Sequence, residues 1–148
     1  SGNLIATGET DLYLYNLDAG LLGSNGNTAY FKYTIVIIGA GTITKRLKVY
    51  FAGTNIYDST AQTFAIGDVI EISGFINRRS SSIARCSVSV QLNTAVAITK
   101  TAYTEITGLT LNSTAYDLKL TGESAGVGSN DNDIVAKLGY VRFEELSQ

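Results

Sequence analysis

Apolar residues recur at every second position along most of this chain of 148 residues. In the clearest case, Leu47, Val49 and Phe51 alternate with Lys48 and Tyr50. Successive side chains of a β-strand point to opposite faces, so this period predicts strands with one buried face. No stretch carries apolar residues at helical spacing over three turns between capping residues. The chain is therefore expected to be all-β. The same alternation recurs over residues 86–92 and 116–121.

Short runs rich in Gly, Asn, Ser and Thr separate these segments, and the chain contains no proline. Asn25-Gly26 suits a turn with positive φ, and Gly53-Thr54 suits a two-residue type II′ hairpin loop. Residues 78–82 have the composition of a polar hairpin tip, and residues 122–133 that of a longer loop. Eight to ten short strands predict one antiparallel sandwich or barrel over residues 1–148. The other strands are expected over residues 11–17, 28–38, 55–58, 68–77, 96–99, 104–109 and 134–144.

The chain lacks histidine and has a single cysteine, Cys86. Histidine is the usual acid or base near neutral pH, and one thiol cannot complete a tetrahedral metal site or an intrachain disulfide. Cys86 lies in an alternating run, so we expect it on the core face with Val88 and Val90. We predict no enzyme activity, no catalytic residue, no cofactor and no tightly bound transition metal.

Acidic residues are the remaining source of catalytic or metal-binding chemistry. The 13 Asp and Glu residues are scattered, so no pair is expected at the separation that glycoside hydrolysis needs. Residues 129–133, Ser-Asn-Asp-Asn-Asp, offer oxygen ligands for Ca²⁺ but lack the spacing of an EF-hand. The preferred interpretation is a loop whose side chains satisfy its own backbone, with Asp133 anchoring the start of the last strand. Weak calcium binding stays an open alternative.

The charge and hydropathy of the chain restrict its partners. A net charge of −2 and a pI of about 5.0 give no electrostatic basis for binding nucleic acid or an anionic membrane. The longest apolar run, residues 33–38, is too short to span a membrane. With only 16% charged residues and a mean hydropathy of +0.13, part of the apolar surface is expected to be covered by further copies of the chain. Because the chain begins Ser1-Gly2 and has no methionine, we expect it to be the C-terminal part of a longer protein.

Two segments carry a family resemblance. Residues 47–59 read Leu-Lys-Val-Tyr-Phe-Ala-Gly-Thr-Asn-Ile-Tyr-Asp-Ser, and residues 118–123 and 132–144 form two further strands around a loop of small residues. Both patterns resemble the C-terminal jelly-roll domains of structural proteins, such as tail or head fibres, from tailed phages and other viruses. The resembled pattern has glycine in place of Ala52 and phenylalanine in place of Tyr57. The resemblance implies a jelly roll and a virion component that often trimerises, and it brings no catalytic residues.

Two hypotheses for function follow. The first is a non-enzymatic domain of the virion that forms a homotrimer, contacts other virion proteins and binds a host-surface glycan. The alternative is a monomeric carbohydrate-binding module of a secreted bacterial protein, in which some of the nine tyrosines form an aromatic platform, although tryptophan is absent. In the first case, polar loops at the tips of the sandwich are the candidate receptor contacts. The candidate residues are Asn25, Asn27, Arg78, Arg79, Asn130 and Asp131.

Overall fold

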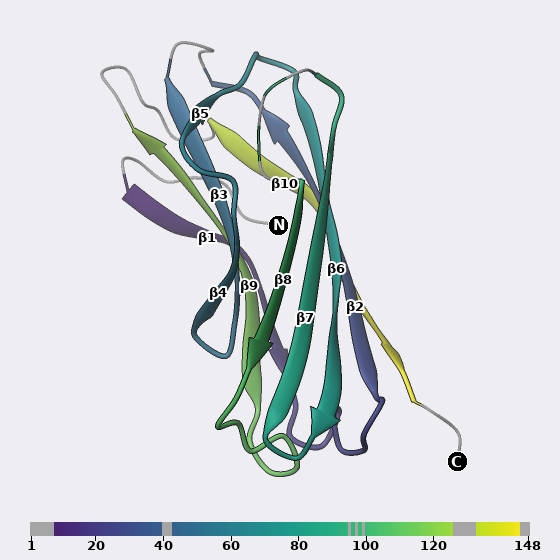
Figure 1. Cartoon of the computed structure of the whole chain (residues 1–148). Coiled ribbons are helices and arrows are strands. Elements are labelled where there is room, and N and C mark those ends of the chain that lie inside the picture. The colour runs from purple at the N-terminus through teal and green to yellow at the C-terminus, as the bar shows by residue number, and fades with distance from the viewer. Residues whose placement is uncertain are drawn as a thin grey trace.

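The computed structural model describes residues 8–39, 43–94, 96, 98, 100–125 and 133–145. These residues form ten strands and no helix, which confirms the predicted all-β antiparallel sandwich (Figure 1). The strands are β1 Gly8–Leu17, β2 Thr28–Ile37, β3 Thr44–Phe51, β4 Thr54–Asp58, β5 Gln62–Thr63, β6 Val69–Ser80, β7 Ile83–Leu92, β8 Thr101–Ile106, β9 Tyr116–Ala125 and β10 Ile134–Glu144.

The ten strands form two five-stranded sheets that face each other (Figure 1). One sheet has the order β1-β9-β3-β4, with β5 pairing beside β3, and is called the β9 sheet. The other has the order β10-β2-β6-β7-β8 and is called the β6 sheet. Every pair of neighbouring strands is antiparallel. The chain crosses between the sheets several times, so each sheet combines strands that are far apart in the sequence.

The alternating residues fill the space between the sheets, as their period predicts. Leu47, Val49 and Phe51 are all buried in β3. Cys86 is 1% exposed and lies on the inner face of β7 with Val88 and Val90, which confirms the expected register. Burial raises the pKa of the Cys86 thiol to about 12. Cys86 is therefore a core residue without the thiolate character that reactive cysteines require.

The hairpin between β3 and β4 turns one residue earlier than expected. Phe51 pairs with Thr54, so the two-residue loop is Ala52-Gly53 and not Gly53-Thr54. Ala52 has φ of 50° and Gly53 has φ of 74°. Two positive φ values indicate a type I′ turn, whose twist matches that of the flanking strands. Alanine is less suited than glycine to this left-handed conformation, and glycine is the residue that the resembled viral pattern has at position 52.

The strand expected over residues 96–99 is not formed at Val96 or Ile98, the two residues of this run that the structure describes. Both side chains pack against the core from an irregular segment, so their alternation reflects packing and not strand pairing. The next strand, β8, begins at Thr101 and ends at Ile106, in place of the expected 104–109. Leu109 lies beyond it, and its backbone N–H donates to the carbonyl of Ser82 at 3.1 Å.

Tyr57 carries a buried hydroxyl that finds no hydrogen-bond partner among the described residues. Its ring lies opposite Val49 on the inner face of the β9 sheet, and burial raises its pKa well above 10. Removing a buried unpaired hydroxyl without changing the ring is neutral or stabilising. We expect Tyr57→Phe to be as stable as the wild type or up to about 1 kcal/mol more stable in urea unfolding.

Tyr13→Phe is the matched control for this prediction. The Tyr13 hydroxyl donates to the carbonyl of Gly139 at 2.9 Å, so its loss should cost about 1 kcal/mol. A Tyr57→Phe variant that loses as much as Tyr13→Phe would contradict the prediction.

Candidate functional site

Arg78 and Asn27, predicted to be exposed tip residues, are buried, with 7% and 5% of their surfaces exposed. The expectation of exposure is wrong because β6 and β7 continue their pairing as far as Ser80 and Ile83. The turn between them is therefore only Ser81-Ser82. Arg78 lies inside the end of the sandwich and not at a flexible tip.

The guanidinium of Arg78 joins β6 to two loops, the β1–β2 loop and the β8–β9 loop. Both loops lie at the lower end of the sandwich in Figure 1. The guanidinium donates to the carbonyl of Leu22 at 2.7 Å, to Oδ1 of Asn25 at 3.1 Å and to Oδ1 of Asn112. The backbone N–H of Arg78 also donates to the carbonyl of Asn27 at 3.0 Å. The structure thus brings Asn25, Asn27 and Arg78 together, but as an internal support for the loops.

Arg79 lies outside this cluster and points to solvent. Its Nη1 lies 2.9 Å from Oε2 of Glu105, and Nε of Arg85 lies 3.2 Å from the same oxygen. Asn25 belongs to the cluster through its hydrogen bond to Arg78, but the residue itself is exposed to solvent. Asn130 and Asp131 lie outside the described residues. Of the predicted set, Arg79 and Asn25 are the ones that the structure leaves accessible.

Asp133 anchors the start of β10, as predicted. Its Oδ2 accepts from the Ser124 hydroxyl at 2.9 Å, and its carbonyl accepts from the N–H groups of Ile38 and Gly39 at 2.9 and 3.1 Å. The nearby Lys45 ammonium is also buried and donates to the carbonyl of Ile43 at 3.1 Å. Burial lowers the pKa of Lys45, while the charge of Asp133 acts in the opposite direction. The end opposite Arg78 therefore contains a buried cation and a buried carboxylate.

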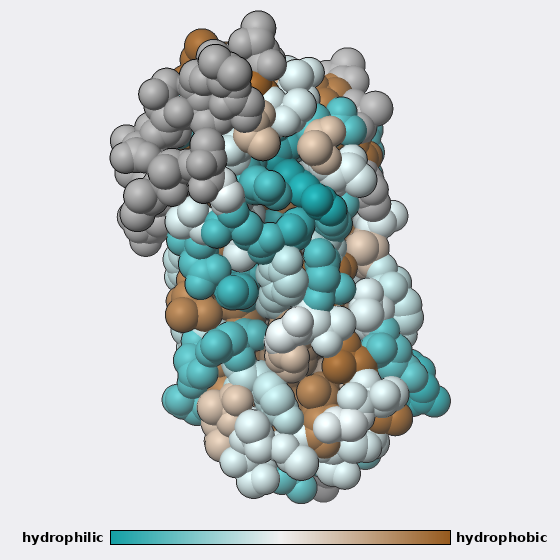
Figure 2. All heavy atoms as spheres, turned by 90° about the vertical axis from the view of Figure 1, so that its left-hand side faces the viewer, coloured by the Kyte–Doolittle hydropathy of each residue, from teal (hydrophilic) through white to brown (hydrophobic). Residues whose placement is uncertain are grey.

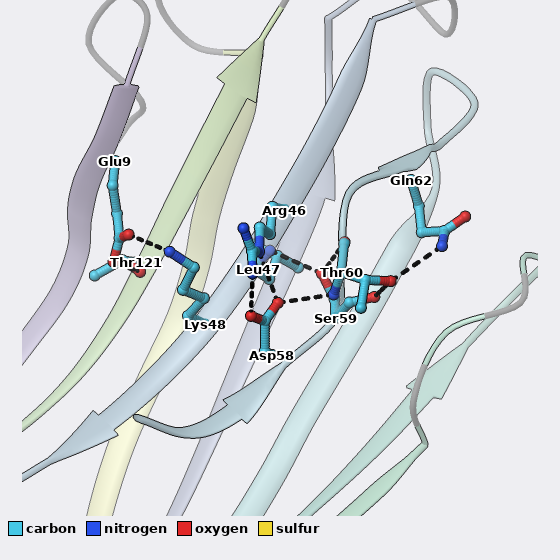
Figure 3. Close-up of polar contacts among 9 residues, drawn as sticks. All are labelled: Glu9, Arg46, Leu47, Lys48, Asp58, Ser59, Thr60, Gln62 and Thr121. Atoms are coloured by element: carbon cyan, nitrogen blue, oxygen red, sulfur yellow. Dashed lines mark hydrogen bonds and ion pairs between the residues drawn. The ribbon is translucent and has the colours of Figure 1, made fainter. Parts of the chain in front are cut away.

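A ladder of polar contacts covers the outer face of the β9 sheet (Figure 3). Lys48 bonds to Glu9, which also accepts from the Thr121 hydroxyl at 2.8 Å. Burial acts to raise the pKa of Glu9, but the hydrogen bonds from Lys48 and Thr121 outweigh it and lower that pKa. Hydrophilic residues gather over the middle of this face in Figure 2. The ladder joins β1, β3 and β9 across the outer face of their sheet.

The second half of the ladder explains the Asp-Ser end of the hairpin pattern over residues 47–59. Arg46 donates to both carboxylate oxygens of Asp58, with Nε 2.8 Å from Oδ1. The Ser59 hydroxyl accepts from the backbone N–H of Leu47 at 2.9 Å. These contacts hold the end of β4 against β3, so the Asp-Ser motif has a structural role.

The bidentate Arg46 contact lowers the pKa of Asp58 below its ordinary 3.8. A carboxylate whose pKa is lower in the folded state stabilises the fold above the unfolded pKa, and this contribution disappears as pH falls through the folded pKa. We expect Asp58→Asn to lose about 1 kcal/mol at pH 7, measured by urea unfolding. Below about pH 3.8 the difference from the wild type should shrink, because wild-type Asp58 becomes protonated. An unchanged difference at pH 3 would contradict the assignment, and Glu145→Gln at an exposed position is the control.

A groove of about 460 Å³ lies on the outer face of the β6 sheet, away from the loops that were predicted as receptor contacts. Its lining residues come from four neighbouring strands and fall in two rows across them. In the first row Arg142 lies beside Tyr30, Tyr30 beside Phe75 and Phe75 beside Ser87. The second row, two residues along each strand, contains Tyr140, Lys32, Ser73 and Ser89.

The groove combines ring faces with hydroxyls and cations. The rings of Tyr30 and Phe75 have centroids 6.3 Å apart, and the Arg142 guanidinium lies 5.1 Å from the centre of the Tyr30 ring. Gly74 lies in β6 between Ser73 and Phe75, and a Cβ there would meet the Ser87 carbonyl at 2.1 Å and the ring of the core residue Phe31 at 2.5 Å. Gly74 therefore lets β6 lie close over Phe31. Ser73, Ser87 and Ser89 form the floor of the groove beside the longer aromatic and cationic side chains.

Within the part of the chain that the structure describes, no group of three or more Cys, Asp or Glu side chains is placed to hold a metal ion. None of the described residues forms a helix long and apolar enough to cross a membrane.

No family model matches this chain, and neither a curated protein nor a solved structure is found to match it. The class that fold and surface define is a two-sheet antiparallel β-sandwich with an aromatic and cationic groove on one outer face.

Proposed function

We propose that this chain is a non-enzymatic structural domain of a virion, in a fibre, a tail or a capsid-associated position, that forms a homotrimer and contacts the host surface. The resemblance of residues 47–59 and 118–144 to viral jelly-roll domains supports the viral assignment. The observation that carries the self-association is the side of the sandwich where the two long edge strands β1 and β10 meet, called the flank here. Each of these strands carries one large exposed leucine, Leu14 on β1 and Leu138 on β10.

Leu14 and Leu138 are 55% and 54% exposed. Leu14 lies opposite Lys119 on the outer face of the β9 sheet, and Leu138 lies opposite Thr34 on the outer face of the β6 sheet. Their neighbours Tyr13 and Gly139 face each other between the sheets and are joined by a hydrogen bond of 2.9 Å. A Cβ at Gly139 would lie 2.5 Å from the Tyr13 ring, so the two strands approach closely here.

The flank also presents the long edges of both sheets. β1 has 10 residues and β10 has 11, and each pairs with one strand among those described. The opposite edges, β4 and β8, have only 5 and 6 residues. Long edge strands with exposed apolar side chains associate with other chains unless they are covered. Three copies around a closed axis would cover this flank without leaving an open end.

Light scattering of the purified chain tests the proposal directly. We expect a mass of about three times the 15.7 kDa of one chain. Leu14→Lys together with Leu138→Lys should give single chains of unchanged fold by circular dichroism, because charges on the flank oppose its burial. Tyr103→Lys is the control, since Tyr103 is 62% exposed on β8 at the opposite edge. A wild-type mass of one chain at all concentrations would overturn the trimer.

A monomeric carbohydrate-binding module of a secreted bacterial protein is the second candidate. The observation in its favour is the groove on the β6 sheet, which places the rings of Tyr30, Phe75 and Tyr140 beside serine hydroxyls. The same mass measurement separates the two, because a module of this kind acts as a single chain.

A further inference from the structure

The groove on the β6 sheet has the two kinds of group that sugars require. Tyr30 and Phe75 offer neighbouring ring faces, on which the C–H face of a pyranose can stack. The hydroxyls of Ser73, Ser87 and Ser89 lie on the adjoining floor, where they can exchange hydrogen bonds with sugar hydroxyls. A mostly apolar concave surface with a few fixed polar groups is the usual form of a small-ligand site.

The charged side chains that line the groove are positive. Lys32 and Arg142 line the groove, and none of the described lining residues is acidic. Each cation has an acidic neighbour outside the lining: Lys32 Nζ lies 2.9 Å from Glu71 Oε1, and Arg142 Nη2 lies 2.8 Å from Glu144 Oε1. These pairs are partly exposed, so each holds its cation only weakly. A ligand carboxylate can replace the glutamate at either cation, and with Arg142 it can form a two-point contact.

The dimensions of the groove limit the size of the ligand that it can bind. The lining runs from β10 through β2 and β6 to β7, which is three strand spacings or about 14 Å. Its two rows are two residues apart along the strands, about 7 Å. This footprint accommodates a disaccharide or trisaccharide lying across the strands. An apolar side chain from a second protein fits poorly, because it would remove the serine hydroxyls and the two ion pairs from water without giving them new hydrogen bonds.

We propose that the groove on the β6 sheet binds an acidic saccharide, with its carboxylate at Arg142 and Lys32 and a sugar face on Tyr30 and Phe75. This site would supply the host contact of the proposed virion domain. The inference rests on the proposed function for the host role, whereas sugar binding itself requires only one chain.

Isothermal titration with matched acidic and neutral probes tests the proposal. The probes are 3′-sialyllactose against lactose, and trigalacturonic acid against its methyl ester. We expect at least one acidic probe to bind at least tenfold more tightly than its neutral partner, and this preference should decrease with added salt. Equal binding of acidic and neutral partners would overturn the acidic assignment, and absence of binding by both acidic probes would overturn the site.

Substitutions of the lining residues test whether the acidic probe binds in the groove. Arg142→Gln and Tyr30→Ala should each weaken binding of the acidic probe at least tenfold. The controls are Lys119→Gln and Tyr50→Ala on the outer face of the other sheet, where Lys119 Nζ lies 5.5 Å from the Tyr50 ring centre. They remove a cation and a tyrosine ring that are paired in the same way outside the groove, and they should change binding less than twofold. Arg142→Gln alters an exposed side chain, so it keeps the test valid if Tyr30→Ala fails to fold. A loss of binding in the controls as large as in the groove variants would overturn the location.

Light scattering on the same samples keeps this inference separate from the proposed function. Binding by a single chain would contradict the trimer and support the groove. A trimer that binds neither acidic probe would leave the assembly proposal standing and remove this one.

Discussion

Arg78→Met is expected to lower the free energy of unfolding by about 2–3 kcal/mol. Arg78 is buried, and its guanidinium donates to Leu22, Asn25 and Asn112. Hydrogen bonds to a charged donor are stronger than neutral ones, and their loss leaves the buried carbonyl of Leu22 without this donor. Urea unfolding followed by tyrosine fluorescence gives the magnitude, and hydrogen exchange should show faster exchange in the two loops that Arg78 joins.

Arg79→Met is the control at the next position. The Arg79 side chain is 51% exposed and pairs only with Glu105 at the surface, so its removal should cost less than about 1 kcal/mol. The two substitutions are chemically identical and differ only in burial. Equal losses at both positions would mean that Arg78 has no special role in holding the loops.

The sequence could not distinguish these two arginines. Both lie in the polar run 78–82, and composition alone predicts a solvated turn there. The partners of Arg78 are 56 positions away at Leu22 and 34 positions away at Asn112. The burial of Arg78 depends on how distant loops meet at one end of the sandwich, and no local pattern carries that information.

Local sequence patterns predicted correctly those features that are determined within a single strand. The face of Cys86, Val88 and Val90 follows from a period of two, because a one-residue slip would expose all of them. Asp133 was likewise predicted as the anchor of the last strand from its position alone, and its contacts with Ser124 and Ile38 confirm it. In such cases the interaction is decided within a few residues of the strand.

The groove could not be predicted without knowing the order of the strands in the β6 sheet. Its first row joins Arg142 to Tyr30, which lie on strands at opposite ends of the chain, and continues to Phe75 and Ser87. Each of these residues is the outward member of an alternating strand and is ordinary in its own context. The combination of rings, hydroxyls and cations appears only when β10 is known to pair with β2.

Lys45→Met is expected to lower the free energy of unfolding by about 3–5 kcal/mol at pH 7. Lys45 has no exposed surface and Asp133 is only 3% exposed. Burial lowers the pKa of Lys45, whereas attraction by Asp133 helps to keep it charged. The charge is therefore costly to bury, but its removal leaves the Asp133 carboxylate buried without this cation, which costs more. Urea unfolding of the variant measures the loss, and Lys137→Met at an exposed position should change stability by less than about 0.5 kcal/mol.

A double-mutant cycle assigns the loss to the pair. Asp133→Asn keeps an oxygen that can accept from the Ser124 hydroxyl but removes the buried negative charge. Combined with Lys45→Met, it removes both charges together, so the double variant should lose less than the sum of the two single losses by about 1–3 kcal/mol. If the two losses simply add, Lys45 and Asp133 act independently, and the upper end of the sandwich is stabilised by their separate hydrogen bonds to Ile43 and Ser124.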